Sequence, residues 1–208
     1  MKGSRPFSKE EIDRIKKHFT GTGSLPIRNR ALFILGANTG FRISELLSLT
    51  LDDLIEETGA IKDRVTVARR NIKGNKSGRT VLLNQAGKTA LLPWLLTLRD
   101  LERIHKSDYI FVNLKVRNRA ISRKHAWKIF KKTYRAAGLT GKLGTHAMRK
   151  TFANNVYSHF LKRASQGEQI DAFRATSKSL GHTDIKSTDQ YLSFLTEDID
   201  KTIEAVGV

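Results

Sequence analysis

The segment from residue 60 to residue 83 constrains the fold most, because it has a strand pattern in a chain that otherwise favours helices. Residues 60–70 (AIKDRVTVARR) alternate polar and apolar side chains, as a half-buried strand does. Residues 73–78 (KGNKSG) form a turn rich in Gly, Asn and Lys, and residues 79–83 (RTVLL) return as a partner strand. We therefore predict a β-hairpin with a cationic tip.

Helical patterns dominate on both sides of this hairpin. In residues 7–12 (FSKEEI), Ser8 is suited to cap a helix, Glu11 to reach back as its partner, and Phe7 to pack on Ile12. The pattern predicts an α+β fold that is mainly α-helical with a small β-hairpin. Further helices are expected at about 28–38, over FRISELLSLTLDDL (41–54), from 84 onward, at 120–137, after 145, around 170 and after 184.

The charge of the chain is its most informative bulk property. Its 208 residues include 38 Lys and Arg against 20 Asp and Glu, which gives a net charge of +18 and a pI near 10.4. Such an excess repels itself in a compact state unless a polyanion neutralises it. Double-stranded DNA is the expected partner, and RNA, a ribosome or a membrane surface are the alternatives.

Several other classes of protein are excluded or disfavoured by composition. No apolar run approaches the length of a membrane span, and the N-terminus has no apolar signal segment. Cysteine is absent, which excludes disulfides and thiolate metal sites and fits a reducing compartment. We expect a cytoplasmic protein, associated with the nucleoid when it is bound to DNA.

The expected helix at 120–137 has an aromatic stripe of Trp127, Phe130 and Tyr134 beside a strongly basic face. Aromatic stripes usually belong to a core, and lysine faces are usually only solvated. This basic face is nearly without acids, which favours a helix that lies on phosphates or in a major groove.

Tyr191 raises the question of nucleophilic chemistry on a phosphodiester. A tyrosine hydroxyl with a pKa of about 10 needs a base, and the transition state needs fixed cationic donors such as arginine. The departing 5′ oxygen needs an acid. Such a site therefore requires a Tyr, two Arg, one or two His, and a Lys.

These residue types occur in suggestive settings. Arg42 lies at the start of an expected helix in TGFRISELLSL, and His146 and Arg149 share a helix face in THAMRKTFA because they are three residues apart. His182 follows a Leu-Gly break and precedes Tyr191 by nine positions. Lys73 and Lys76 occupy the hairpin tip. Each residue alone would more often be structural; their joint occurrence favours a catalytic site.

Several segments resemble the conserved boxes of the tyrosine recombinases, the phage-integrase family. TGFRISELLSLTLDDL is similar to the family's first Arg box, GTHAMRKTFA to its His-x-x-Arg box, and LGHTDIKSTDQYLSF to its final His and Tyr box. The hairpin stretch KSGRTVLL is similar to its K-x-G stretch. The order and spacing of these motifs cover nearly the whole chain, which makes the resemblance specific. It implies the DNA breaking-rejoining enzyme fold of a tyrosine-recombinase catalytic domain.

The resemblance also implies roles for matched residues. Arg42 and Arg149 would clamp the scissile phosphate. His146 would accept the proton of Tyr191, and His182 would hydrogen-bond the phosphate and hold the tyrosine.

A hairpin lysine would protonate the 5′ oxygen: Lys76 is the first choice and Lys73 its competitor. Glu45 is expected to buttress Arg42 or the fold, and Asp53 to cap a helix locally. No metal and no cofactor is implied. DNA contacts are expected from six residues: Lys73, which also competes for the role of general acid, and Arg79, Arg123, Lys124, Lys128 and Lys131.

The sequence departs from the family pattern in three respects. Lys150 stands where many relatives have His, and the interval from Arg149 to His182 is longer than usual, with the extra residues expected in 162–176. The resemblance begins almost at residue 7, so residues 1–208 are expected to be one catalytic domain without the N-terminal core-binding domain, either naturally short or a fragment. The tail, 192–208, is expected to pack on its own domain or to dock on a neighbouring protomer.

The expected function is site-specific DNA recombination through a 3′-phosphotyrosine intermediate, with integration, excision and inversion all open. The resemblance implies a homo-oligomer, a tetramer on DNA, and leaves room for accessory proteins. Two alternatives remain open: a DNA-binding regulator or architectural protein with this fold but no cleavage, and a type IB topoisomerase-like relaxing activity.

Overall fold

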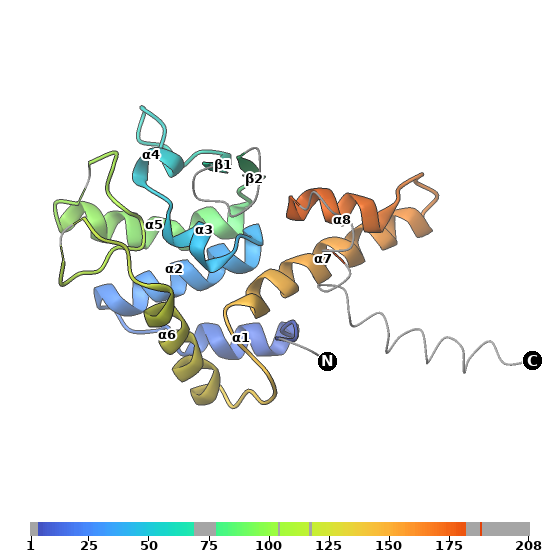
Figure 1. Cartoon of the computed structure of the whole chain (residues 1–208), viewed down its shortest axis with the longest axis horizontal. Helices are drawn as coiled ribbons and strands as arrows, with labels where there is room; N and C mark the ends of the chain where they lie inside the picture. Colours follow the sequence, from blue (N-terminus) through green and yellow to red (C-terminus); the bar gives the residue numbers. More distant parts are fainter. Residues whose placement is uncertain (1–3, 69–77, 104, 117, 182–187, 189–208) are drawn as a thin grey trace, which may run out of the picture. The chain divides into compact units, whose positions relative to one another are not determined.

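The computed structural model describes residues 4–68, 78–103, 105–116, 118–181 and 188 (Figure 1). The chain divides into a larger unit of residues 3–152 and a smaller unit that contains residues 153–208. Helices dominate the described ranges, and within them no helix is long and apolar enough to cross a lipid bilayer.

The first helix, α1 (Lys9–Lys17), begins with the predicted reciprocal cap. The Ser8 hydroxyl accepts a hydrogen bond from the Glu11 N–H at 3.2 Å, and the Glu11 carboxylate accepts from the Ser8 N–H at 3.0 Å. Glu11 also binds both terminal nitrogens of Arg5, at 2.6 and 2.7 Å, and Arg5 reaches the carbonyl of Thr140 at 3.0 Å. The cap therefore ties the start of the chain to a distant loop.

Helix α2 (Ser24–Thr39) forms the centre of the larger unit. It begins four residues before the predicted start, after the N-cap Gly23. Residues 31–35 are all buried, as is typical of a helix surrounded by protein, and α2 packs along α5 (Gln85–Asp100; Figure 1). It ends at Gly40, which adopts the left-handed conformation with φ of 60°.

The single helix predicted over 41–54 was wrong. The structure has two short helices there, α3 (Ile43–Leu47) and α4 (Leu51–Leu54). The interruption has a local cause, because the Asp53 carboxylate accepts hydrogen bonds from both the N–H and the hydroxyl of Thr50, at 2.9 and 3.0 Å. This cap starts a new helix where the old one would have continued, and it confirms the expected capping role of Asp53.

The predicted hairpin is confirmed by strands β1 (Arg64–Val67) and β2 (Arg79–Leu82), which pair antiparallel with Arg64 opposite Leu82. Val65 and Val81 are buried on the face that meets the core. The tip of the hairpin, residues 69–77, lies outside the described residues.

The YIFVNL segment, too short to assign from its pattern, is a buried part of the core. Ile110 and Phe111 are fully buried, and Ile110 accepts a hydrogen bond from the indole N–H of Trp94 at 2.7 Å. Trp94 lies on α5 and is also fully buried. The indole therefore joins α5 to this extended segment without leaving its polar group unsatisfied.

Helix α6 (Arg123–Ala136) confirms the predicted amphipathic helix, with one error in its stripe. Phe130 and Tyr134 are buried as expected, but Trp127 is 46% exposed. The buried face is completed by Ala126, four residues before Phe130, and position 127 lies about a quarter-turn away from it.

The smaller unit contains the end of α7 (His146–Ser165) and α8 (Ala172–Leu180). Arg163 and Glu168 form a bidentate ion pair across the turn between them. Residues 162–176, where extra length was expected, form the end of α7, this turn and the start of α8. The helix predicted after 184 lies outside the described residues.

The Arg5–Glu11 contact predicts a pH-dependent contribution to stability. The hydrogen bond from Arg5 holds the pKa of Glu11 below its usual value. The contribution is therefore complete above the unfolded pKa of about 4.3 and is lost as the pH falls through the lower folded pKa. Glu11→Gln should lower the free energy of unfolding by about 1–2 kcal/mol at neutral pH, and the difference should be smaller at about pH 3.

Urea denaturation at the two pH values measures this difference. Asp13→Asn is the matched control, because its pair with Lys16 is exposed on both sides and should contribute less than about 0.5 kcal/mol. A Glu11→Gln loss that is equal at both pH values would contradict the assignment.

Candidate active site

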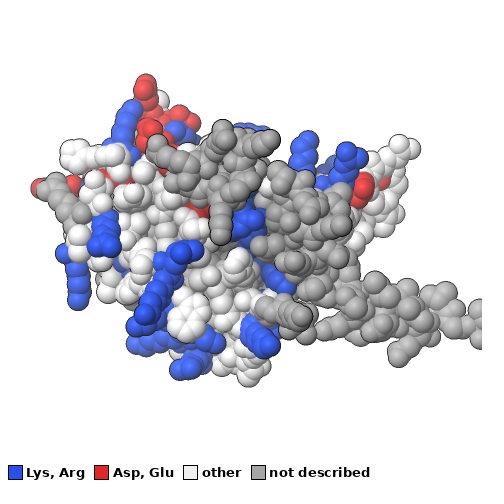
Figure 2. All heavy atoms as spheres, in the orientation of Figure 1, with Lys and Arg blue, Asp and Glu red and all other residues white. Residues whose placement is uncertain are grey.

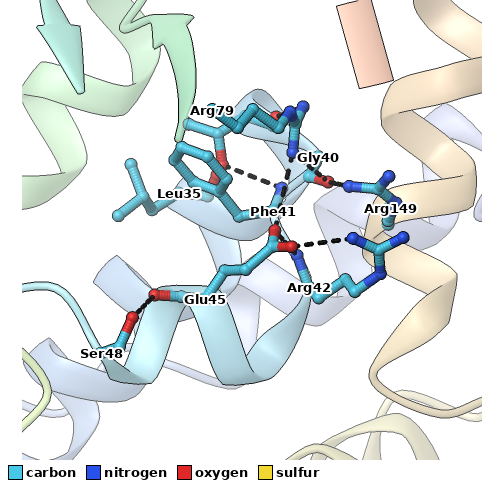
Figure 3. A network of polar contacts seen from close by, with 9 residues as sticks. Leu35, Gly40, Phe41, Arg42, Glu45, Ser48, Arg79 and Arg149 are labelled. Carbon is cyan, nitrogen blue, oxygen red and sulfur yellow. Dashed lines mark hydrogen bonds and ion pairs between the residues drawn. The ribbon is translucent and has the colours of Figure 1, made fainter. Parts of the chain in front are cut away.

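Arg42 lies in a tight turn between two helices, held by a buried carboxylate. It is the N-cap of α3, two residues after Gly40 ends α2. The Glu45 carboxylate accepts the Arg42 backbone N–H at 2.7 Å and its guanidinium at 2.9 Å (Figure 3). The Glu45 side chain is 1% exposed, whereas that of Arg42 is 40% exposed. Glu45 therefore buttresses Arg42, as expected, while part of the guanidinium remains at the surface.

Arg149 reaches the same turn from a distant part of the chain. It is the fourth residue of α7 and is buried, and its guanidinium donates a hydrogen bond to the carbonyl of Gly40. Figure 3 shows Arg42 and Arg149 next to each other beside Gly40. The two arginines predicted to act together are therefore brought together, although 106 residues lie between them in the sequence.

The turn requires glycine at position 40. Its φ of 60° is a conformation that other residues rarely adopt, and a Cβ there would lie 2.4 Å from Cδ1 of Phe152. The absence of a side chain therefore lets α7 approach α2 closely enough for Arg149 to contact the Gly40 carbonyl.

Arg79 occupies a different position from the one expected of a DNA contact. It is 6% exposed, and its guanidinium donates to the carbonyls of Thr39 at 2.9 Å and Gly40 at 3.1 Å. It lies 3.7 Å from the Glu45 carboxylate and 4.9 Å above the centre of the Phe41 ring. These contacts leave little of Arg79 at the surface for a phosphate.

The burial of Arg79 could have been predicted from the strand pattern. Residues 79, 81 and 83 share one face of β2 and its extension, and Val81 and Leu83 are apolar and buried. Charge alone predicts a contact with DNA, whereas the alternation of the strand places the side chain inward. The Gly40 carbonyl accepts hydrogen bonds from both Arg79 and Arg149. Apart from the Thr-Gly helix break, nothing in the sequence predicts this shared acceptor.

His146 is the first residue of α7, three residues before Arg149, which confirms that the two share a helix and a face. Although the residue is exposed overall, nearby protein atoms displace water from the imidazole, and this is the main cause that lowers its pKa. The positive charges of Arg149, Arg42 and Lys150 lower the pKa further. His146 is therefore neutral near pH 7 and able to accept a proton.

The charges of the site favour an anion. Arg42 and Arg79 pair with the Glu45 carboxylate, and Arg149 binds the neighbouring Gly40 carbonyl, so these four described side chains together carry an excess of positive charge. Arginine N–H groups fixed by protein contacts are well suited to bind phosphate oxygens. Among the described residues, no cluster of His, Asp and Glu side chains could hold a metal ion.

Four predicted catalytic or competing residues lie outside the described part of the chain: Lys73, Lys76, His182 and Tyr191. Their roles stay predictions.

The predicted DNA-contacting face of α6 is at the surface. Arg123, Lys124 and Lys128 are exposed and Lys131 is partly exposed. In Figure 2, Lys and Arg atoms gather over the region that α6 occupies in Figure 1, and the acidic atoms visible in this view lie elsewhere, many of them near α4. The cationic face is therefore a separate surface feature from the buried arginine cluster.

The sequence profile of the phage integrase family matches residues 5–197, so the chain belongs to this family. The family confirms the predicted resemblance.

Individual relatives are recombinases. The tyrosine recombinase XerD of Halalkalibacterium halodurans is 30% identical over 183 residues, which cover 88% of this chain and 54% of that protein. The tyrosine recombinase XerA of Pyrococcus furiosus is 29% identical, over 88% of this chain and 56% of that protein. The chain thus spans about half the length of the curated relatives it matches.

Solved structures confirm the fold class. The structure of the XerH recombinase on its palindromic difH substrate aligns over 100% of this chain and 54% of its own, with a TM-score of 0.70 and 23% identity. The XerA recombinase structure aligns over 97% of this chain and 66% of its own, with a TM-score of 0.69 and 20% identity. The mainly helical fold with a small antiparallel hairpin is therefore that of tyrosine-recombinase structures.

The geometry of residue 40 predicts a large effect of a small substitution. Gly40→Ala should lower the free energy of unfolding by about 1–2 kcal/mol for the left-handed backbone and by a further 1–3 kcal/mol or so for the clash with Phe152. Gly59→Ala is the matched control, because its φ is 85° but no atom lies within 4 Å of the added Cβ. Equal losses in urea denaturation would show that the close approach of Phe152 is unimportant.

The environment of His146 predicts a low titration midpoint. The imidazole should titrate below about pH 6.5 in proton NMR, with its resonance assigned through His146→Gln. Arg42→Gln removes one neighbouring positive charge but leaves the local burial in place, so the midpoint should rise without reaching the usual value. A midpoint at or above 6.5 in the unsubstituted protein would contradict this environment.

Proposed function

We propose that this chain is the catalytic part of a site-specific DNA recombinase that cleaves and rejoins DNA through a 3′-phosphotyrosine. One observation carries the proposal: Arg149, from a distant segment, binds the Gly40 carbonyl next to Arg42, and the charges of both arginines act on His146. Family membership and the recombinase relatives support the same activity.

The arginines would bind the two non-bridging oxygens of the scissile phosphate. Negative charge on these oxygens increases as phosphorus becomes five-coordinate, so fixed N–H donors stabilise the transition state more than the ground state. Glu45 fixes Arg42, and the Gly40 carbonyl fixes Arg149. Arg42 is already accessible to a phosphate, whereas Arg149 is 1% exposed and would have to become accessible when the phosphate binds.

The reaction would proceed by two proton transfers. The hydroxyl oxygen of Tyr191 attacks phosphorus while its proton passes to the neutral imidazole of His146. The bond from phosphorus to the 5′ oxygen breaks, and a hairpin lysine donates a proton to that oxygen. His182 would hydrogen-bond the phosphate. A 5′ hydroxyl from a second duplex then attacks the phosphotyrosine, which restores the phosphodiester and releases Tyr191.

The substrate would be double-stranded DNA held largely through its backbone. The net charge of +18 and the basic, exposed face of α6 supply cationic groups for phosphate contacts. Two structural neighbours support this substrate and an assembly of several copies: XerH is bound to difH DNA, and a lambda integrase dimer is bound to a core site. We propose a homo-oligomer on DNA, a tetramer in the active complex, with residues 192–208 as a candidate docking segment.

Covalent trapping tests the proposal directly. A library of nicked duplexes with randomised inverted arms is incubated with the protein, and the adducts that survive SDS are recovered and sequenced. Wild-type protein should enrich a family of sites, and Tyr191→Phe should form no adduct because its ring has no nucleophilic oxygen. Binding to DNA without any Tyr191-dependent adduct would instead favour the DNA-binding regulator. Resealing of one strand, without exchange between duplexes, would favour the topoisomerase alternative.

The same selected duplex assigns the general acid. Lys76→Ala should slow adduct formation by about 10²–10⁴-fold, the usual contribution of general acid catalysis, and Lys73→Ala should have a smaller effect. The opposite ranking would transfer the role to Lys73 and leave the proposed reaction intact.

A further inference from the structure

We propose that Arg79 is a positioning residue for the phosphate clamp, the pair formed by Arg42 and Arg149. It would act on Arg149 through the Gly40 carbonyl and on Arg42 through the Glu45 carboxylate. The inference rests on the proposed function, because it assigns a role within the same site. Although Arg79 is buried and would not touch the substrate, its loss should slow cleavage.

Arg79 first fixes the end of a helix. The last carbonyl groups of α2 have no partner within the helix, and the helix dipole places partial negative charge there. The Arg79 guanidinium donates to two of these carbonyls, those of Thr39 at 2.9 Å and Gly40 at 3.1 Å. One side chain of β2 thereby fixes the point at which α2 ends and the Arg42 turn begins.

The Gly40 carbonyl then transmits this constraint to Arg149. The same oxygen accepts hydrogen bonds from Arg79 and from Arg149 (Figure 3). If Arg79 is removed, the carbonyl keeps Arg149 but loses the contact that orients it. The guanidinium of Arg149 should then occupy a wider range of positions relative to the phosphate.

The Glu45 carboxylate transmits the constraint to Arg42. One of its oxygens lies 3.7 Å from Arg79 and the other accepts from the Arg42 guanidinium at 2.9 Å. The carboxylate is almost completely buried, so its charge depends on both cations for compensation. Loss of Arg79 would remove one of the two cations beside the Glu45 carboxylate and thereby change the electrostatic interaction that positions the Arg42 side chain.

Arginine is the residue type that this position needs. Its planar group carries several N–H donors in a fixed fork, which matches two adjacent carbonyls, and it stacks on aromatic rings. The guanidinium carbon lies 4.9 Å from the centre of the Phe41 ring. A lysine would keep the charge but could not form this set of contacts with the same geometry.

Arg28 provides a matched control within the same unit. It is 2% exposed, and it donates to the carbonyl of Val112 at 3.1 Å and to the side chain of Asn29 at 2.9 Å. It is therefore also a buried arginine that joins a helix to a distant segment. Within the described part of the chain, the hydrogen bonds of Arg28 go to Val112 and Asn29 and not to the Arg42 turn, so its loss should affect stability without acting on the clamp.

The experiment compares Arg79→Met, Arg79→Lys and Arg28→Met on the duplex selected by covalent trapping. Single-turnover cleavage at saturating DNA should slow on the order of 10²-fold in both Arg79 variants, the effect of a small misplacement of catalytic groups. DNA affinity should change by less than about threefold, because the buried side chain makes no phosphate contact. Arg28→Met should lose stability but cleave within about threefold of wild type per folded molecule.

A duplex with sulfur in place of the 5′-bridging oxygen separates the clamp from the leaving group. A thiolate departs without protonation, so this substrate should restore the rate of the lysine variant that lacks the general acid. It should not restore Arg79→Met, because the defect lies in the stabilisation of the phosphate oxygens.

The possible outcomes distinguish a failure of the Arg79 inference from a failure of the proposed function. Restoration of Arg79→Met by sulfur would place Arg79 on the leaving-group side and overturn the inference. Cleavage by Arg79→Met equal to that of Arg28→Met, or failure of both Arg79 variants to fold while Arg28→Met folds, would show a structural role only. Absence of cleavage by wild-type protein would contradict the proposed function instead.

Discussion

The carbonyl oxygen of Gly40 is the acceptor on which the candidate active site depends. It receives hydrogen bonds from Arg79 on β2 and from Arg149 on α7, while Arg42 follows it by two residues. A carbonyl at the end of a helix is available for this purpose because no residue within the helix bonds to it. Left-handed glycine directs that carbonyl away from the helix and lets α7 approach. One backbone group thus sets the relative positions of two cationic side chains.

Burial distinguishes the charged groups of the site. Glu45, Arg79 and Arg149 are almost completely buried, whereas the Arg42 side chain is partly exposed. The Arg42 guanidinium can meet a phosphate directly, and the buried Glu45 carboxylate fixes its position through contacts that solvent does not screen. Arg149 has to become accessible before it can bind the same phosphate. The pKa of His146 is lowered mainly because nearby protein atoms displace water from its imidazole, and further by the same positive charges, so the ring is neutral. The cluster therefore combines an anion-binding surface with a group able to accept a proton.

Much of the fold could be predicted from local patterns, and the failures have local causes. The Ser8 cap, the hairpin and the amphipathic α6 are encoded within a few residues, so periodicity and capping rules were sufficient. The break between α3 and α4 was missed because the Thr50–Asp53 cap competes with an apolar pattern that continues through it. For the site, motif spacing identified Arg42, His146 and Arg149. The alternation in β2 predicts that Arg79 is buried, but its partners Thr39 and Gly40 lie about 40 positions away, and no local pattern identifies them.

The α6 surface and the arginine cluster are separate, so the groups that supply affinity for DNA differ from the groups that would carry out the chemistry. Contacts between exposed lysines and a DNA backbone release counterions, so they supply affinity that weakens with salt. The buried contacts of Arg79 and Glu45 lie where mobile ions have little access, so the geometry of the clamp should be nearly independent of ionic strength. In a chain of charge +18, positive charge by itself therefore cannot identify the arginines proposed to act in catalysis. They are identified by what fixes them: a helix end, a glycine, and a buried carboxylate.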